Sequence, residues 1–251
     1  MIRSLIAAAA TATVLSALPA AAFDMTDMSD AERAAFRAEV RAYLLENPEV
    51  LMEAIAVLEQ REAMAQAQAD VNLIAENAPA IFEDGHSWIG GNPEGDVTLV
   101  EFMDYRCGFC RRAHPEVEAL LAGDGNIRLI VKEFPILGEE SLLASRFAIA
   151  TKLEMGDDAY KTVHDALIEM RGEVTLASLE RLAGELDLDV DAVLTGMVDP
   201  EVDRIIAENR ALAQTLGITG TPTFILPGQM LRGYLPLDGM QAVVAEERGE
   251  G

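Results

Sequence analysis

The chain has 251 residues, half of them hydrophobic, which is enough for one domain with a sizeable core and an appendage. Its formal net charge is −24, and lysine occurs only at positions 132, 152 and 161. This argues against nucleic acids and anionic membranes as partners, because both are bound through basic patches. The acidity is typical of a soluble exported protein. Beyond the first 22 residues, no stretch is apolar enough to span a bilayer.

The first 22 residues have the pattern of a secretory signal peptide. Arg3 is the only charged residue among the first 23, and residues 5–18 form an apolar, alanine-rich run. A small-residue cleavage motif follows at residues 19–22. We expect cleavage after Ala22. A retained membrane anchor is less favoured, because the run is short for a spanning helix. Export predicts a compartment in which disulfides persist, and a bacterial periplasm fits best.

Residues 23–84 are predicted to form an N-terminal helical arm. A capping-box sequence at residues 29–32 opens the first helix. The Asn-Pro pair at residues 47–48 suits the start of a second helix, whose apolar residues recur at helical spacing until Pro79. A long amphipathic arm favours self-association, giving a homo-oligomer through residues 24–78. Packing of the arm on its own domain is an equally open alternative.

The two cysteines of the chain lie three positions apart, between a predicted strand and a predicted helix. After a turn-rich connector over residues 85–95, residues 98–102 are predicted as a buried strand and residues 111–121 as a helix. The sequence Cys107-Gly108-Phe109-Cys110 therefore opens the helix. The positive end of a helix and its free N–H groups stabilise a thiolate and lower its pKa. We predict a pair suited to reversible thiol–disulfide exchange, with Cys107 as the exposed nucleophile.

Other roles of the cysteine pair are less favoured. A zinc site needs four nitrogen or sulfur ligands, and the sequence holds no second cysteine pair, so no metal site is predicted. A purely structural disulfide would close a loop too small to remove much entropy from the unfolded chain. Two thiolates suit Cu(I), so a copper-binding protein stays open as an alternative, although the eleven methionines are scattered.

The rest of the chain combines strands with a long helical block. Residues 127–134 are predicted as a second strand and residues 139–216 as four helical segments. Residues 221–226 and 230–233 are predicted as further strands, followed by a helix over residues 237–247. The order strand–helix–strand, helical block, strand–strand–helix predicts an α/β fold in which a small sheet is interrupted by a helical insertion.

With the cysteine pair at the start of the first helix, this layout resembles a thioredoxin fold that carries an inserted helical domain. Residues 85–251 resemble the DsbA-like family of periplasmic thiol–disulfide oxidoreductases. The arm resembles the helical extensions of family members related to the copper-tolerance protein ScsC, some of which self-associate. The resemblance implies three regions: a signal peptide over residues 1–22, the arm over residues 23–84, and a DsbA-like domain over residues 85–251 with the insertion at about 139–216.

Residues 217–224 resemble the cis-proline loop of that family. In the family this loop faces the disulfide, and the backbone before the proline pairs with the bound substrate. The resemblance therefore implies catalytic roles for Thr221 and Pro222. It implies a substrate-binding surface made of Gly108, Phe109, Thr221, Pro222 and Thr223. The alternative is an ordinary proline at the start of a strand.

Glu101 lies on the incoming strand, six residues before Cys107. In the resembling family an acidic residue at this place lies beneath the second cysteine and relays its proton. Cys110 has to lose a proton to expel a mixed disulfide, and a buried carboxylate with a raised pKa would accept it. The alternative is an exposed strand residue. Lys132 is expected to pair with Glu101 if both face the same layer, and a solvated lysine is equally open.

The resemblance implies that the chain exchanges disulfides with exported client proteins, Cys107 attacking and Cys110 resolving. The intervening Gly-Phe is closer to the Gly-Tyr of the isomerase DsbC than to the Pro-His of DsbA. We favour an isomerase or reductase that a membrane redox partner keeps reduced, and a disulfide-donating oxidase is the alternative. No cofactor is expected. A chaperone or adaptor whose cysteines are incidental is a further alternative.

Overall fold

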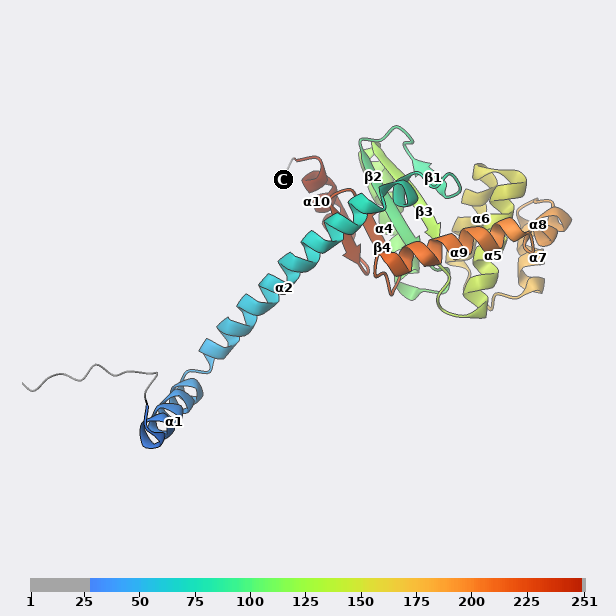
Figure 1. Cartoon of the computed structure of the whole chain (residues 1–251). Coiled ribbons are helices and arrows are strands. Elements are labelled where there is room, and N and C mark those ends of the chain that lie inside the picture. Colours follow the sequence, from blue (N-terminus) through green and yellow to red (C-terminus); the bar gives the residue numbers. More distant parts are fainter. Residues whose placement is uncertain (1–27, 250–251) are drawn as a thin grey trace, which may run out of the picture. The chain divides into compact units, whose positions relative to one another are not determined.

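The structure is a computed structural model, and it describes residues 28–249 (Figure 1). The described chain divides into two compact units between Gln60 and Arg61. The predicted signal peptide, with its expected cut after Ala22, lies outside the described residues. Between residues 28 and 249 no helix is long and apolar enough to cross a membrane.

The first unit consists of α1 (Asp30–Glu46) and the beginning of α2 (Glu49–Glu76). The predicted capping box is present: the Ser29 N–H donates to the Glu32 carboxylate over 2.9 Å, and the Glu32 N–H donates to the Ser29 hydroxyl. Helix α2 begins one residue after the predicted start, since Pro48 lies in the turn before it. No side chain within residues 28–60 is buried, although many there are apolar. A hollow of about 370 Å³ is lined by Phe36, Arg37, Val40, Arg41, Leu44, Leu45 and Leu51.

The second unit contains one five-stranded sheet in the order β1-β3-β2-β4-β5. Its strands are β1 (Trp88–Gly91), β2 (Val97–Met103), β3 (Ile127–Glu133), β4 (Thr223–Leu226) and β5 (Gln229–Arg232). Strands β2 and β3 are parallel, and the other neighbours are antiparallel. Helices cover both faces of the parallel pair, which explains why both strands have nearly continuous apolar runs.

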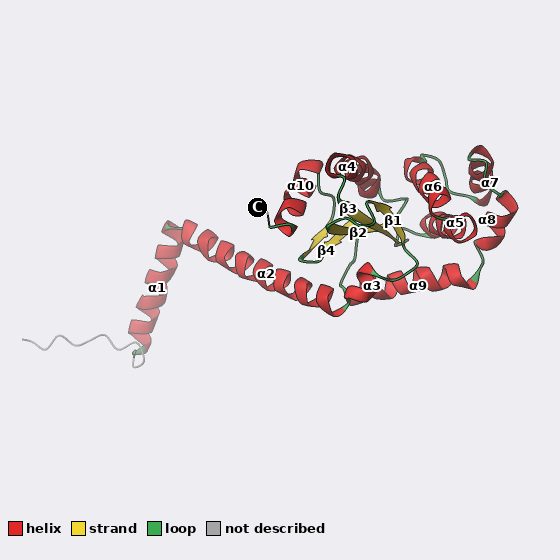
Figure 2. Cartoon of the chain, turned by 90° about the horizontal axis from the view of Figure 1, so that it is seen from above, coloured by secondary structure: helices red, strands yellow, loops and turns green. Residues whose placement is uncertain are grey.

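Helices α4 and α10 lie on one face of the sheet, and α3 and α9 lie on the other (Figure 2). The inserted helices α5 to α8 pack together beside the β1 edge. The helices of this unit are α3 (Ala78–Phe82), α4 (Gly108–Asp124), α5 (Glu139–Met155), α6 (Asp157–Glu169), α7 (Leu176–Glu185), α8 (Val190–Gly196), α9 (Pro200–Thr215) and α10 (Leu237–Glu247). The predicted α/β fold with a helical insertion is confirmed.

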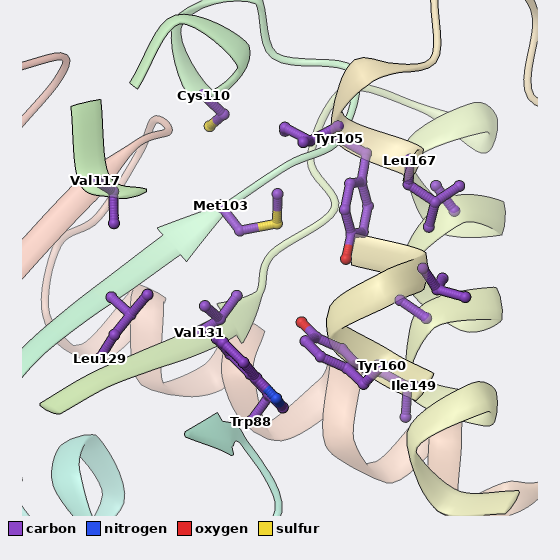
Figure 3. Packing of buried hydrophobic residues seen from close by; sticks show 14 of the residues in the cluster. Trp88, Met103, Tyr105, Cys110, Val117, Leu129, Val131, Ile149, Tyr160 and Leu167 are labelled. Atoms are coloured by element: carbon purple, nitrogen blue, oxygen red, sulfur yellow. The ribbon is translucent and has the colours of Figure 1, made fainter. Parts of the chain in front are cut away.

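Two apolar cores form because side chains alternate across the sheet. In β2, Leu99 and Met103 join the larger core, which also takes in Cys110 on α4 and Tyr160 on α6 (Figure 3). Val100 and Phe102, which point the other way, join the smaller core on the opposite face. The cysteine pair thus lies at one end of the larger core, and the packing of α4 on the sheet fixes its position.

Three elements differ from the sequence predictions. Strand β1 lies in the predicted connector over residues 85–95, where the glycine pair suggested only a turn. Helix α3 includes Pro79, which was predicted to end the preceding helix, because proline is tolerated in the first turn of a new helix. Helix α8 is a fifth segment of the helical block, begun by the side chain of Asp189, which caps the N–H of Ala192.

Lys132 does not pair with Glu101, and it is not solvated either. The register of β2 and β3 places Phe102, not Glu101, opposite Lys132. Since paired residues on adjacent strands face the same side, Lys132 points to the face opposite Glu101. There it is fully buried and forms an ion pair with Asp84. Burial raises the pKa of Asp84, but the charge and hydrogen bond of Lys132 and the hydrogen bonds from Ser87 together outweigh burial and hold that pKa at about 2.

Replacing Lys132 by alanine is expected to lower the free energy of unfolding by about 3–5 kcal/mol, because it leaves a poorly solvated carboxylate without its partner. The matched control is Lys152→Ala, which removes the more exposed pair with Asp157 at 3.2 Å and should cost less than about 1 kcal/mol. Urea unfolding of the two variants measures the difference. Equal losses would contradict the buried pair described here.

Candidate active site at the cysteine pair

Cys107 occupies the N-cap position of α4, with extended backbone angles of φ −76° and ψ 118°. Its backbone N–H donates to the carbonyl of Asp104 over 3.0 Å. Neither cysteine is in a disulfide, and the Cys107 sulfur lies 3.1 Å from the carbonyl oxygen of Thr221, to which the protonated thiol donates. Cys107 is only 7% exposed, less than predicted for an exposed nucleophile, because the proline loop closes over it.

The surroundings of Cys107 stabilise its thiolate. The Cys110 thiol contributes most, and the Thr221 side chain and the backbone N–H groups of Phe109 and Cys110 add to it. Together they outweigh burial and lower the pKa of Cys107 from 9.0 to about 5. Donors at a helix N-terminus are the physical cause expected for such a shift. At neutral pH Cys107 is therefore a thiolate, ready to attack a disulfide.

Cys110 has the opposite character. It lies one turn into α4 with 1% of its surface exposed. Burial raises the pKa of the Cys110 thiol far above its ordinary value, and the neighbouring Cys107 and the charge of Glu101 add to the effect. The two cysteines thus divide into one activated thiolate and one protonated, sheltered thiol. Such a pair can attack with one sulfur and resolve with the other once a base takes the second proton.

Glu101 is on β2, 6% exposed and on the face of the sheet that α4 covers. Burial is the main cause that raises the pKa of Glu101 to about 8, and the charges of Cys107, Glu118 and Glu133 contribute. A carboxyl group with this pKa gains and loses its proton near neutral pH, as a proton acceptor for Cys110 has to. Glu101 is thus buried with a raised pKa, as expected from the sequence, and is not the exposed strand residue of the alternative.

The proline loop sits against Cys107. The peptide bond between Thr221 and Pro222 is cis, as the family resemblance implied. Thr221 is half-buried, while Pro222 and Thr223 are buried. The Thr223 hydroxyl donates to the Gly220 carbonyl over 2.9 Å, which fixes the loop where it enters β4. The structure thus brings Thr221 and Cys107 into contact although 114 positions separate them.

The two residues between the cysteines are on the surface. Gly108 is exposed, and a Cβ atom placed there would have nothing within 4 Å. Phe109 is 60% exposed, which is unusual for a large apolar side chain. An exposed aromatic ring beside a reactive thiol offers an apolar contact for a bound polypeptide.

Asp104 is a positioning residue that the sequence did not reveal. It is fully buried between β2 and α4. Its carboxylate accepts hydrogen bonds from the backbone N–H groups of Arg106, Ile136 and Leu137, at 2.7, 2.8 and 3.1 Å. These bonds fasten the loop before Cys107 to the segment after β3. An aspartate directly after a buried strand was the available signal.

A second buried carboxylate, Glu133, lies at the end of β3. It accepts hydrogen bonds from the hydroxyl groups of Tyr105, Tyr160 and Ser145, at 2.7, 2.6 and 2.8 Å. Figure 3 shows the two tyrosine rings with their hydroxyl groups turned toward each other. Burial raises the pKa of Glu133 to about 7, against the effect of these hydrogen bonds. No local sequence pattern predicts this cluster, because its members come from β3, α5, α6 and the loop before α4.

The pH dependence of alkylation tests the asymmetry of the pair. Iodoacetamide is expected to modify Cys107 of the reduced protein with a midpoint near pH 5 and to leave Cys110 unmodified at pH 7, because only a thiolate reacts. Mass spectrometry of peptides from samples quenched at a series of pH values measures both. A midpoint near the ordinary thiol value of 9.0 would contradict the stabilised thiolate.

Curated relatives match the chain over part of their length. An example is the Na(+)/H(+) antiporter NhaA 3 of Salinispora tropica, which is 29% identical over 184 residues, covering 73% of this chain and 28% of the antiporter. The antiporter NhaA 1 of Salinispora arenicola is 32% identical, with 24% of its length matched. The chain thus spans about a quarter of the length of these relatives.

Solved structures match over nearly their whole length. A thioredoxin-like oxidoreductase from Silicibacter pomeroyi is 40% identical, with a TM-score of 0.65 over 69% of this chain and 98% of that one. The thiol-disulfide exchange protein alpha-DsbA2 from Wolbachia pipientis is 27% identical, with a TM-score of 0.67 over 72% and 97%.

Two family models match separate parts of the chain. The model of the copper resistance protein ScsC N-terminal domain matches residues 32–65. The model of the DSBA-like thioredoxin domain matches residues 98–245, more than half of the chain, and this stretch contains the cysteine pair and the proline loop. The chain therefore belongs to the family of DsbA-like thioredoxin domain proteins.

Proposed function

We propose that this protein is a thiol–disulfide oxidoreductase that exchanges disulfides with exported client proteins through Cys107 and Cys110. The observation that carries the proposal is the contrast between the two thiols: the pKa of Cys107 is lowered to about 5, and that of Cys110 is raised by burial. A structural disulfide needs no such contrast. Exchange needs it, because one sulfur has to attack and leave while the other waits in protonated form.

In the proposed reaction the Cys107 thiolate attacks one sulfur of a client disulfide. A bond forms between Cys107 Sγ and that sulfur, and the other client sulfur leaves as a thiolate. Glu101 then takes the proton of Cys110, whose thiolate attacks Cys107 Sγ. The Cys107–Cys110 disulfide forms and the second client sulfur leaves, so the client is reduced by two electrons and the pair is oxidised. The reverse sequence donates a disulfide.

The client is proposed to bind as an extended strand along the proline loop. The support is the half-buried position of Thr221 beside the Cys107 sulfur and the exposed ring of Phe109 next to it. Gly108 leaves room for the approach, and Pro222 and Thr223 hold the loop. Binding through backbone groups is indifferent to the client's side chains, which suits an enzyme with many clients.

For the direction of electron flow we propose an isomerase or reductase, in which a membrane redox partner returns the pair to the dithiol. The Gly-Phe dipeptide between the cysteines supports it, because it is closer to the Gly-Tyr of the isomerase DsbC than to the Pro-His of DsbA. A disulfide-donating oxidase is the second candidate, and one observation favours it: a thiolate stabilised as strongly as that of Cys107 stabilises the reduced form and makes the pair more oxidising.

Thiol trapping in cells separates the two directions. Acid quenching and alkylation of the native protein, with fractionation of the compartments, are expected to show an exported, periplasmic protein whose pair is mostly reduced. A mostly oxidised pair would favour the oxidase. A protein retained in the cytoplasm would contradict the proposed exchange with exported clients.

We further propose that the protein forms homo-oligomers through residues 24–78. The apolar side chains of residues 28–60 that are left exposed support this, as does the match of residues 32–65 to the ScsC N-terminal domain. Sedimentation equilibrium of the full chain should give more than one copy per particle, and Phe36→Glu should lower that number. The matched control is Leu176→Glu, another exposed apolar position, on α7. A monomeric full chain would contradict the proposal.

A further inference from the structure

Two histidines and an aspartate meet between α4 and α6, about one helical turn beyond Cys110. His114 is on α4, and His164 and Asp165 are on α6. One donor atom from each lies within 4.8 Å of the other two, and His114 Nε2 is 3.3 Å from the Asp165 carboxylate. No step of the proposed exchange uses these residues.

The hydrogen bonds around His164 define which of its nitrogens carries a proton. The Tyr105 hydroxyl donates to Glu133, which receives three hydroxyl donors in total. The Tyr105 proton is therefore in use, and the His164 Nδ1–H, 3.1 Å away, donates to the Tyr105 oxygen. This leaves a lone pair on His164 Nε2. A histidine held through one ring nitrogen with the other free is the arrangement that metal-ligating histidines have.

The cluster has an opening to solvent. His114 also lines a cavity of about 560 Å³, together with Arg111, Pro115, Ile168, Glu169 and Arg171. The His114 side chain is 15% exposed, while His164 is almost fully buried. The cavity therefore exposes the cluster to solvent at His114, where a water molecule can complete the coordination of an ion, although Arg111 and Arg171 place positive charge at the cavity wall.

We propose that His114, His164 and Asp165 form a binding site for a divalent transition-metal ion of the Zn²⁺ class. Two imidazoles and one carboxylate are a donor set typical of zinc sites with an open position. With zinc–ligand distances of about 2.0–2.1 Å, two ligands of a tetrahedral ion lie about 3.3 Å apart. The His114–Asp165 pair already has this spacing. The other donor separations, which are at most 4.8 Å, have to shorten when the ion binds.

Lys161 competes with the ion for Asp165. Its Nζ lies 2.7 and 2.6 Å from the two carboxylate oxygens of Asp165 and 3.3 Å from Glu118. A cation this close opposes a divalent ion. Its removal should therefore strengthen binding, an effect that loss of folding cannot imitate.

Equilibrium dialysis with Zn²⁺ tests the site in the full chain. The parent for this experiment carries Cys107→Ser and Cys110→Ser, so that no thiol binds the ion. We expect one Zn²⁺ per chain, a loss of affinity of at least about tenfold in His114→Ala, and a gain of about fivefold in Lys161→Gln. His86→Ala is the matched control, since His86 is the third histidine of the chain and should leave the affinity unchanged.

Equal Zn²⁺ affinities in the parent, His114→Ala and Lys161→Gln would overturn the proposal, and so would the absence of one-to-one binding. Co²⁺ as a second probe reports the ligands through its visible absorption, which should change in His114→Ala and persist in His86→Ala. Because the thiols are absent from every sample, no outcome bears on the proposed disulfide exchange.

Discussion

Replacing Cys107 by serine is expected to lower the rate of thiol–disulfide exchange by at least about a thousandfold, because the attacking thiolate is lost and the buried, protonated Cys110 cannot take its place. The reduction of a fluorescent peptide disulfide measures the rate. The stabilised thiolate is the feature of the site that supplies the nucleophile, so no other substitution should have a larger effect.

Cys110→Ser is the matched control for that experiment. It keeps the Cys107 thiolate, so the first attack should continue while the covalent intermediate accumulates. The two variants should therefore behave differently: Cys107→Ser should not react with the disulfide, whereas Cys110→Ser should react and stop at the mixed disulfide. Normal exchange by Cys107→Ser would show that the pair is incidental and would favour a chaperone or adaptor.

Glu101→Gln is expected to slow resolution of the mixed disulfide by about a hundredfold, since the proton of Cys110 loses its nearby acceptor. The first attack by Cys107 should stay fast. Rapid-quench kinetics with a peptide disulfide separates the two steps. Glu180→Gln, at an exposed position on α7, is the control and should leave both steps unchanged.

Glu101→Gln should also raise the free energy of unfolding at high pH. The pKa of Glu101 is 4.5 in the unfolded chain and about 8 in the folded one, mainly because of burial. Between pH 4.5 and pH 8 the folded protein holds a proton on Glu101 that the unfolded chain has lost. The stability that protonated Glu101 contributes is therefore intact below pH 4.5 and is lost as the pH rises through 8. A shift of this size corresponds to at most about 5 kcal/mol.

Glutamine cannot ionise, so Glu101→Gln should be more stable than the parent above pH 8 and similar to it below pH 4.5. Urea unfolding of the reduced proteins at pH 4, 7 and 9 gives the comparison. If Glu101→Gln were less stable than the parent at pH 9, the surroundings of Glu101 would favour its charged form, which contradicts the raised pKa.

The features that the sequence alone revealed are local ones. The capping box at residues 29–32, the strand before Cys107 and the final helix over residues 237–247 each depend on residues close together in the chain. The cysteine pair and the Thr-Pro sequence are equally local, and their contact followed from resemblance to a family whose fold is fixed. Short-range patterns thus predicted the elements and the chemistry of the pair.

The features that the sequence did not reveal depend on register and on distant contacts. The partner of Lys132 depends on the register of β2 and β3, because a shift of one position would move its side chain to the other face of the sheet. The hydrogen bonds of Glu133 join β3 to α5 and α6. Strand β1 carries a glycine pair that is typical of turns, and pairing with β3 overrides that preference. Such information exists only once the chain is folded.

The most direct test of the central claim is a trapping experiment with Cys110→Ser and a peptide disulfide. A single adduct should form, and mass spectrometry should place the peptide on Cys107. With Cys107→Ser no adduct should form at neutral pH, because the buried Cys110 stays protonated. An adduct on Cys110 of that variant, with none on Cys107 in the first, would reverse the roles of the two cysteines and contradict the account.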